Sequence, residues 1–248
     1  MPRFFVKQDQ INDTSIIICG EDAHHIARSL RMAVGDKLTV CDMRGNEYDC
    51  VITDFTDDIQ VNTEIRGVTH SENESPVYIR LFQALPKGDK LDTIIQKAVE
   101  CGVSEIIPFE SERCVVRIKQ DAEDRKTERR NRIAAEAAKQ CGRSVLPTVN
   151  KSVSFSQMLD MASKSDVVLF CYEGDGTLAL GNILDEWKSK MPDSVSIIIG
   201  SEGGFSISET QKAVDMGMCL TGLGKRILRT ETASGFVLAC ISCVCELH

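Results

Sequence analysis

The segment VSIIIGSEGGF, residues 195–205, decides the fold class of this chain. Its first five residues are largely β-branched or apolar, and the strand that they predict ends at Gly200. Residues 201–204 then form a tight turn, in which glycines allow a positive φ or close approach of the backbone to a ligand. Residues 206–209, SISE, open a helix. A strand, a glycine-rich turn and a helix in this order are typical of an α/β sheet that binds a ligand at the turn.

A second loop, LGKRILRTETA at residues 223–233, also lies between a short apolar segment and a helix. Two such loops at strand ends indicate a ligand site. A phosphate-binding loop would continue with lysine and then serine or threonine after its glycines. Here Phe205 and Ser206 follow instead, and Glu202 would repel phosphate. A nucleoside triphosphatase is therefore disfavoured.

Size and composition fit one large domain or two smaller ones, with 248 residues, 42% hydrophobic and 27% charged. No apolar run reaches the roughly 20 residues that span a membrane. The first residues also lack the pattern of a secretory signal. We therefore expect a cytoplasmic protein that makes no contact with a membrane.

The eleven cysteines are odd in number and scattered, which predicts reduced thiols and no disulfide framework. Most lie within apolar segments, where a free thiol is usually buried. The thiols expected to be buried are Cys19, Cys41, Cys50, Cys171 and Cys219. Cys240, Cys243 and Cys245 have no second ligand pair nearby, so no metal site is expected.

Charge is distributed unevenly along the chain. The net charge of −8 argues against indiscriminate binding of nucleic acid. Residues 113–143 nevertheless carry ten Lys or Arg and five Asp or Glu, which leaves −13 for the remainder. A basic segment on an acidic protein indicates one defined contact with a polyanion. A solvated helix of mixed charge is the alternative.

Residues 1–72 are predicted to form a small β-barrel with one helical insert. In the insert, residues 22–32, the apolar side chains of Ile26, Leu30 and Met32 are expected to face inward. Adjacent helical residues point about 100° apart, so His24 and His25 cannot both face one site, and a capping or core role is expected. The expected strands are residues 15–19, 37–41, 47–52 and 59–62, with a hairpin turn at 44–46.

After a polar linker at residues 70–76, strands and helices alternate, which predicts an α/β domain with a mainly parallel sheet. The expected strands are residues 77–85, 105–108, 113–116, 167–172, 195–199 and 219–223. The expected helices are residues 89–102, 122–141, around 183–187, from 208, and 232–246. On the second helix, Arg129, Ile133, Glu136, Gln140 and Arg143 form one stripe, which faces solvent, a polar ligand or another subunit.

Several ordered motifs resemble those of the ribosomal RNA small-subunit uridine N3-methyltransferases, which belong to the SPOUT superfamily. They are KGDK at 87–90, ECGV at 100–103, RCVVR at 113–117, RIAAEAAKQ at 132–140, IGSEGGF at 199–205 and the 223–233 loop. Residues 3–5, 24–31 and 35–36 match the family's PUA-like barrel. The resemblance covers almost the whole chain. It implies a PUA-like RNA-binding barrel in residues 1–72 and a SPOUT methyltransferase domain in 73–248, with a parallel sheet and a deep trefoil knot, although chains are usually unknotted.

The resemblance also implies a homodimeric enzyme that methylates N3 of one uridine in 16S ribosomal RNA within the assembled small subunit, using S-adenosylmethionine. The implied cofactor residues are Tyr172, Glu173, Gly174, Gly200, Ser201, Glu202, Gly203, Gly204, Leu223, Gly224, Ile227 and Leu228. The implied catalytic residues are Arg229, Arg226 and Glu231. The implied RNA-binding residues are Arg28, Arg31, Arg113, Arg117, Arg132 and Arg143.

Methylation at N3 requires loss of the imide proton, and arginine donors suit the anion that results. A carboxylate or a water molecule could accept this proton. Glu136 and Glu231 are both candidates, and Glu231 could instead support the start of the last helix. Two alternatives stay open. One is a non-catalytic RNA-binding assembly factor with the same fold, and the other is a methyltransferase with a different target nucleotide.

Overall fold

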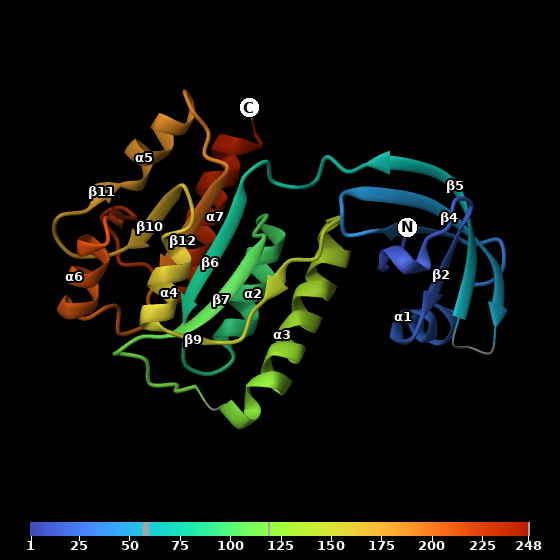
Figure 1. Ribbon diagram of the computed structural model, residues 1–248, viewed down its shortest axis with the longest axis horizontal. Coiled ribbons are helices and arrows are strands. Elements are labelled where there is room, and N and C mark those ends of the chain that lie inside the picture. The colour runs from blue at the N-terminus through green and yellow to red at the C-terminus, as the bar shows by residue number, and fades with distance from the viewer. Residues whose placement is uncertain (57–59, 119, 248) are drawn as a thin grey trace. The chain divides into compact units, whose positions relative to one another are not determined.

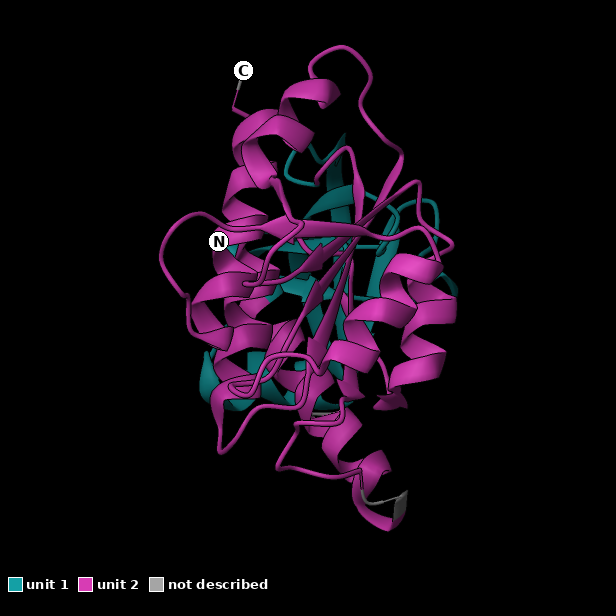
Figure 2. Ribbon diagram, turned by 90° about the vertical axis from the view of Figure 1, so that its left-hand side faces the viewer, with its two compact units in different colours: residues 1–74, 138–146 teal, residues 75–137, 147–248 magenta. Residues whose placement is uncertain are grey.

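The structure is a computed structural model that describes residues 1–56, 60–118 and 120–247 (Figure 1). It divides into two compact units, coloured separately in Figure 2. Unit 1 comprises residues 1–74 and 138–146, and unit 2 comprises residues 75–137 and 147–248. The domain boundary between residues 72 and 73 stays a prediction.

Unit 1 is built on a five-stranded sheet with the order β1-β3-β4-β5-β2. β1 pairs with β3 in parallel, and the other neighbours are antiparallel. The strands are β1 Arg3–Phe5, β2 Ser15–Cys19, β3 Lys37–Cys41, β4 Asn46–Thr56 and β5 Gln60–His70. The helices are the 3-10 turn η1 Gln8–Gln10, α1 Glu21–His24, and the π-helical turn η2 His25–Ser29, which continues α1. The strands and the helical insert predicted for this unit are confirmed, and closure of the sheet into a small β-barrel stays a prediction.

Side chains of one face of this sheet form the core of unit 1, including Phe4, Ile16, Ile18 and Leu38. Alternation of buried and exposed residues along the strands explains why most of them could be predicted. β1 was not predicted, and Ile59, placed in the fourth expected strand, lies outside the described residues.

The insert differs from the prediction at its end. Ile26 is fully buried and Met32 packs against the core, but Leu30 is 41% exposed. The helical turns stop at Ser29, and Arg31 adopts a φ of 53°, so the periodicity that would bury Leu30 is broken. His24 and His25 are both exposed, so a core role for them is wrong.

Unit 2 is built on an eight-stranded parallel sheet with the order β11-β13-β10-β12-β6-β7-β8, and β9 also pairs with β7. The strands are β6 Tyr78–Ala84, β7 Glu105–Glu110, β8 Thr148–Val149, β9 Val153–Ser154, β10 Val167–Cys171, β11 Leu178–Ala179, β12 Ser194–Ile199 and β13 Cys219–Gly222. The helices are α2 Lys90–Glu100, α3 Gln120–Cys141, α4 Phe155–Ala162, α5 Leu180–Trp187, α6 Ile207–Asp215 and α7 Thr230–Cys245. The last turn of α3 belongs to unit 1. The prediction of an α/β fold with a parallel sheet is confirmed.

Helices cover both faces of the sheet in unit 2 (Figure 2). Its central strands are therefore buried on both sides, and residues 195–199 of β12 are all at most 2% exposed. This double coverage explains why β12 reads as a nearly continuous apolar run. The carboxyl end of β12 is where residues 200–204 begin.

Residues 113–116 do not form the predicted strand. β7 ends at Glu110, and the chain then turns, with the amide of Cys114 donating to the carbonyl of Ser111 at 3.1 Å. Cys114 is buried while Val115 is 67% exposed, and the described residues 113–116 are turn, bend or irregular backbone with no strand among them. α4 was not predicted, although Ser154 and Gln157 form a capping box at its start.

The thiols only partly follow the prediction. Cys41, Cys50 and Cys171 are buried, whereas Cys19 is exposed because it is the last residue of β2 and points away from the core. Burial raises the pKa of the Cys41 thiol to about 11. All eleven cysteines are free thiols.

Within residues 1–56, 60–118 and 120–247, none of the helices combines the length and the apolar character that crossing a membrane requires. The same residues contain no group of three or more His, Cys, Asp and Glu side chains placed to hold a metal ion.

Candidate functional site

A cavity of about 400 Å³ lies in unit 2 where β10, β12 and β13 end. Its walls come from the loops that follow these three strands and from Lys90 at the start of α2. The volume suits a small molecule, and the carboxyl ends of parallel strands are where α/β sheets bind ligands. All the predicted cofactor residues line the cavity except Gly174 and Gly203.

Residues 200–204, here called the Gly loop, form one wall of the cavity. Gly204 has a φ of 64°, and a Cβ atom on Gly200 would lie 3.2 Å from the Phe205 ring and 3.3 Å from the Cα atom of Gly204. The loop is anchored by Phe205, whose ring lies 4.4 Å from that of Phe170, centroid to centroid. Behind it, Ser206 caps α6 by accepting from the amide of Glu209. The glycines are therefore required by close packing and by positive φ.

Gly203 and Gly174 support the cavity without lining it. The Arg113 guanidinium donates to the carbonyl of Gly203 at 3.0 Å, and a Cβ atom on Gly203 would lie 3.0 Å from the Cβ of Arg113. A Cβ atom on Gly174 would lie 2.3 Å from the ring of Tyr172. Glycine at position 174 therefore allows the Tyr172 ring to lie against this turn.

A buried chain of hydrogen bonds connects three elements beside the cavity. The Gln83 side-chain amide donates to the Thr230 hydroxyl at 2.9 Å, and this hydroxyl donates to the carbonyl of Gly200 at 2.7 Å. These two hydrogen bonds connect the end of β6, the first residue of α7 and the start of the Gly loop. Sequence reasoning missed both Gln83 and Thr230, because the two residues are far apart along the chain.

A charged cluster lies beside the Gly loop. The Lys90 ammonium is 2.9 Å from Glu202 Oε1 and 3.4 Å from Glu231 Oε2. The hydrogen bond to Glu202 raises the pKa of Lys90. Burial opposes ionisation of Glu202, but hydrogen bonds from Lys90 and from backbone amides outweigh it and hold the Glu202 pKa below its ordinary value. Lys90 was part of the KGDK motif, but its place in the cavity was not predicted.

The predicted catalytic residues lie in or next to the cavity. Arg226 and Arg229 both line it and are exposed. Glu231 does not line it, but its carboxylate contacts Lys90, which does. Glu231 Oε2 is buried and, beyond this ion pair with Lys90 at 3.4 Å, has no hydrogen-bond partner among the described residues. The lining residues that were not predicted are Lys90, Cys171, Thr177, Ile199, Phe205, Gly222, Lys225, Thr230 and Ala233.

The arginines predicted to bind RNA have different surroundings. Arg28 and Arg31 are exposed on unit 1. In unit 2, Arg117 forms an ion pair with Glu110 at 2.8 Å. Arg132 is largely exposed, and its guanidinium lies 3.7 Å from Glu128 one turn earlier in α3. Exposure of Arg28, Arg31 and Arg132 leaves them accessible to a polyanion.

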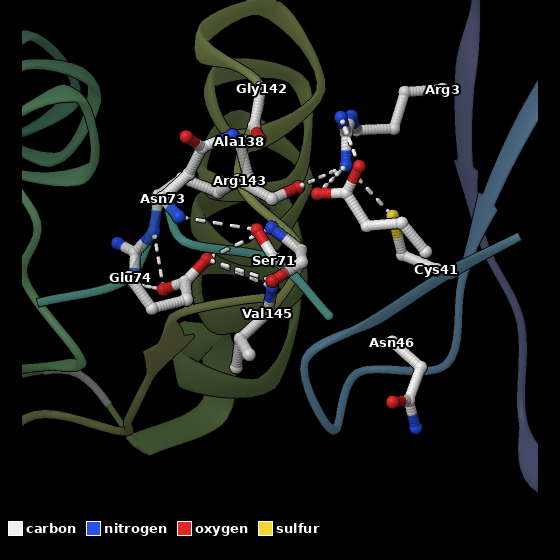
Figure 3. Close-up of polar contacts among 12 residues, drawn as sticks. Arg3, Cys41, Asn46, Ser71, Asn73, Glu74, Ala138, Gly142, Arg143 and Val145 are labelled. Carbon is white, nitrogen blue, oxygen red and sulfur yellow. Dashed lines mark hydrogen bonds and ion pairs between the residues drawn. The ribbon is translucent and has the colours of Figure 1, made fainter. Parts of the chain in front are cut away.

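Arg143 is buried within unit 1 and lies beyond the end of α3 (Figure 3). Its guanidinium donates to Glu74 Oε2 at 2.6 Å, while the amides of Ser144 and Val145 donate to Glu74 Oε1. Because α3 stops at Cys141 and Gly142 has a φ of 82°, the predicted polar stripe ends before Arg143.

Comparison with known proteins gives one consistent family. An RNA methyltransferase domain model matches residues 73–242, and an RNA methyltransferase PUA domain model matches residues 18–65. The ribosomal RNA small subunit methyltransferase E of Bacillus subtilis is 34% identical over 252 aligned positions, which cover 100% of this chain and 98% of that protein.

Solved structures agree with the sequence matches. A methyltransferase of Legionella pneumophila in complex with the cofactor SAM is 30% identical with a TM-score of 0.83, covering 97% of this chain and 96% of that one. The ribosomal RNA small subunit methyltransferase E of Neisseria gonorrhoeae bound to S-adenosyl methionine is 29% identical with a TM-score of 0.85, covering 98% of both chains. With a family model over most of its length and a relative that aligns from end to end, this chain belongs to the ribosomal RNA small subunit methyltransferase E family.

Proposed function

We propose that this RNA methyltransferase transfers a methyl group from S-adenosylmethionine to N3 of one uridine in 16S ribosomal RNA. The observation that carries the proposal is the cavity at the ends of β10, β12 and β13, which Arg226 and Arg229 line together with the Gly loop. Relatives with the same fold hold this methyl donor in their crystal structures.

The chemistry of the cavity fits this cofactor, which would supply an electrophilic methyl group on a sulfonium cation. Leu223, Ile227 and Leu228 provide an apolar wall for the adenine, and the glycines expose backbone groups to it. The hydroxyl of Ser201 lines the cavity, is buried and has no hydrogen-bond partner among the described residues, so it is available to a ligand. The carboxylate of Glu173 also lines the cavity and would favour a cation.

The protein's own part in the reaction is to hold the uridine anion and to accept its imide proton. Arg226 and Arg229 stay charged and can donate to the carbonyl oxygens on either side of N3. Of the two candidate bases, Glu231 is favoured because its carboxylate contacts the cavity-lining Lys90, whereas Glu136 lies exposed on α3. The target uridine must be unpaired or extruded from its helix to reach these groups.

RNA contacts are proposed for Arg28, Arg31 and Arg132, which are exposed. They are also proposed for Arg113 and Arg117, which lie with Arg132 in the basic segment 113–143. Phosphate contacts of this kind position the RNA without reading its sequence. The overall acidity of the chain supports a substrate presented by an assembled small subunit, since bulk RNA would be repelled. A cytoplasmic location follows from such a substrate.

A trefoil knot in unit 2 and a homodimer complete the proposal. Both rest on the family resemblance, and exposed apolar side chains on unit 2, such as Ile207 at 82% and Phe236 at 40%, support a subunit interface. Light scattering coupled to size exclusion should give twice the mass of the 27.4 kDa chain. A monomeric mass at micromolar concentration would contradict the dimer.

Mass mapping of ribosomal RNA from a deletion strain tests the target. Loss of one N3-methyluridine from 16S RNA, restored by the wild-type gene, is expected, and loss of a different mark would overturn the assignment. Calorimetry with S-adenosylmethionine separates the enzyme from a non-catalytic assembly factor. A protein that binds no S-adenosylmethionine would favour the assembly factor.

A further inference from the structure

The Lys90 ammonium connects three segments beside the cavity, the start of α2, the Gly loop and the start of α7. Lys90 is the first residue of α2, Glu202 belongs to the Gly loop, and Glu231 lies in the first turn of α7. The amide of Lys87 also donates to Glu202 Oε1 at 3.2 Å, so this carboxylate is held by one donor from the loop before α2 and one from the first residue of α2. These contacts connect segments that are more than one hundred residues apart in the chain, with a separation of 112 between Lys90 and Glu202.

The contacts of Lys90 differ from those of an ordinary surface ion pair. The side chains of Lys90, Glu202 and Glu231 are 36%, 28% and 25% exposed. The one ammonium group forms ion pairs with both carboxylates. Without that ammonium, two carboxylates would face each other across the cavity rim. Like charges that share a partly buried site repel, and each would lose its nearest counter-charge.

The two carboxylates sit on the segments that shape the cavity. Glu202 is within the Gly loop, and Glu231 is two residues after Arg229, which immediately precedes α7 and lines the cavity. The buried link through Gln83 and Thr230 fixes the start of the Gly loop, but it makes no contact with Glu202. Lys90 therefore provides a separate connection for the outer part of the loop.

We propose that Lys90 is a positioning residue, which holds the Gly loop and the start of α7 in the arrangement that binds the methyl donor. The proposal rests on the proposed function of the cavity. Replacement of Lys90 should let the two carboxylates separate, which displaces backbone groups of the Gly loop from the donor and moves Arg229 relative to the uridine.

Calorimetry with S-adenosylmethionine on Lys90→Met tests this role. We expect the Kd to rise about tenfold, as for residues coupled through one charged network. Lys97→Met is the matched control. Lys97 lies on the same helix and forms an ion pair with Glu100 at 2.9 Å, and neither residue lines the cavity. This control should stay within about twofold of wild type, as expected for an exposed pair. Lys90→Arg keeps the charge and should recover most of the affinity.

A double-mutant cycle with Glu202→Gln separates positioning from general destabilisation. In a Lys90→Met background, Glu202→Gln should cause no further rise in Kd, since the same contact is already lost and the repulsion with Glu231 is relieved. Independent effects of the two substitutions, or an unchanged Kd in Lys90→Met, would overturn the proposal. Equal losses in Lys90→Met and Lys97→Met would also overturn it.

Hydrogen exchange of the ligand-free protein keeps this test apart from the proposed function. Amides of residues 200–205 should exchange faster in Lys90→Met than in wild type and in Lys97→Met, because the loop loses a tether. If wild type bound no S-adenosylmethionine while this difference persisted, the proposed function would fail, but Lys90 would still be shown to hold the Gly loop. Unchanged exchange in these amides would refute the positioning role itself.

Discussion

Close packing around the Gly loop limits which side chains it can hold, and a substitution at Gly203 tests whether this loop binds the methyl donor. A Cβ atom on Gly203 would lie 3.0 Å from the Cβ of Arg113, which leaves no room for a branched side chain. Gly203→Val should raise the Kd for S-adenosylmethionine at least about tenfold while circular dichroism shows a folded protein. Gly181→Val is the control, because a Cβ atom there would meet nothing within 4 Å. Wild-type affinity in Gly203→Val would show that this loop does not bind the donor.

Arg229 is the residue whose charge is proposed to act on the uridine. It lines the cavity and is exposed, so its removal should leave the loop that precedes α7 folded. Arg229→Ala should lower kcat about a hundredfold, the usual loss when one donor to a developing anion is removed, with little change in cofactor Kd. Lys188→Ala, which changes an exposed cation on unit 2 outside the cavity, should leave both constants unchanged. A loss confined to cofactor affinity would contradict the assigned role.

At the scale of elements, ionised Glu202 links the Gly loop to the start of α2. Its pKa in the folded protein lies below the ordinary value of 4.5, so its contribution to stability is present at neutral pH. That contribution should decline as the pH falls below 4.5 through the folded-state pKa.

The melting temperature of Glu202→Gln should therefore lie below that of wild type at pH 7, and the difference should narrow as the pH falls below 4.5. Differential scanning calorimetry across this range measures both values. Glu100→Gln, which removes the exposed pair with Lys97, should give only a small difference at neutral pH. A Glu202→Gln difference that stayed constant with pH would show that the carboxylate charge does not stabilise the loop.

At the scale of the whole molecule, Arg143 stabilises unit 1 by fixing the chain that follows α3. Its side chain is 6% exposed and forms an ion pair with the carboxylate of Glu74, which also accepts hydrogen bonds from two backbone amides (Figure 3). Arg143→Met should lower the free energy of unfolding by about 2–4 kcal/mol, because a partly buried carboxylate loses its counter-charge. Urea denaturation measures this change.

Arg132→Met is the matched substitution, since Arg132 is 65% exposed and its ion pair with Glu128 is long, at 3.7 Å. It should change the free energy of unfolding by less than about 0.5 kcal/mol while weakening RNA binding. If Arg143→Met kept wild-type stability and lost RNA affinity instead, the predicted RNA contact of Arg143 would be supported over its structural role.

Elements whose signals are local could be predicted from the sequence. The apolar run of β12, the glycines after it and the Ser206–Glu209 cap all lie within fifteen residues and agree with one another. The segment 113–116 also has apolar residues but is a turn, and among the described residues it pairs with none of the strands. Leu30 was misplaced for a related reason, since the helix that would bury it ends one residue earlier.

The sequence by itself determined the α/β class, the family and the two loops that wall the cavity, because strand periodicity, glycine placement and helix caps are properties of neighbouring residues. Only the tertiary structure decided which distant groups meet at that cavity. The Gln83–Thr230 bond spans 147 residues, and the contact of Lys90 with Glu202 spans 112. Contacts of this kind depend on how strands are ordered in the sheet, and no local pattern in a single sequence records that order.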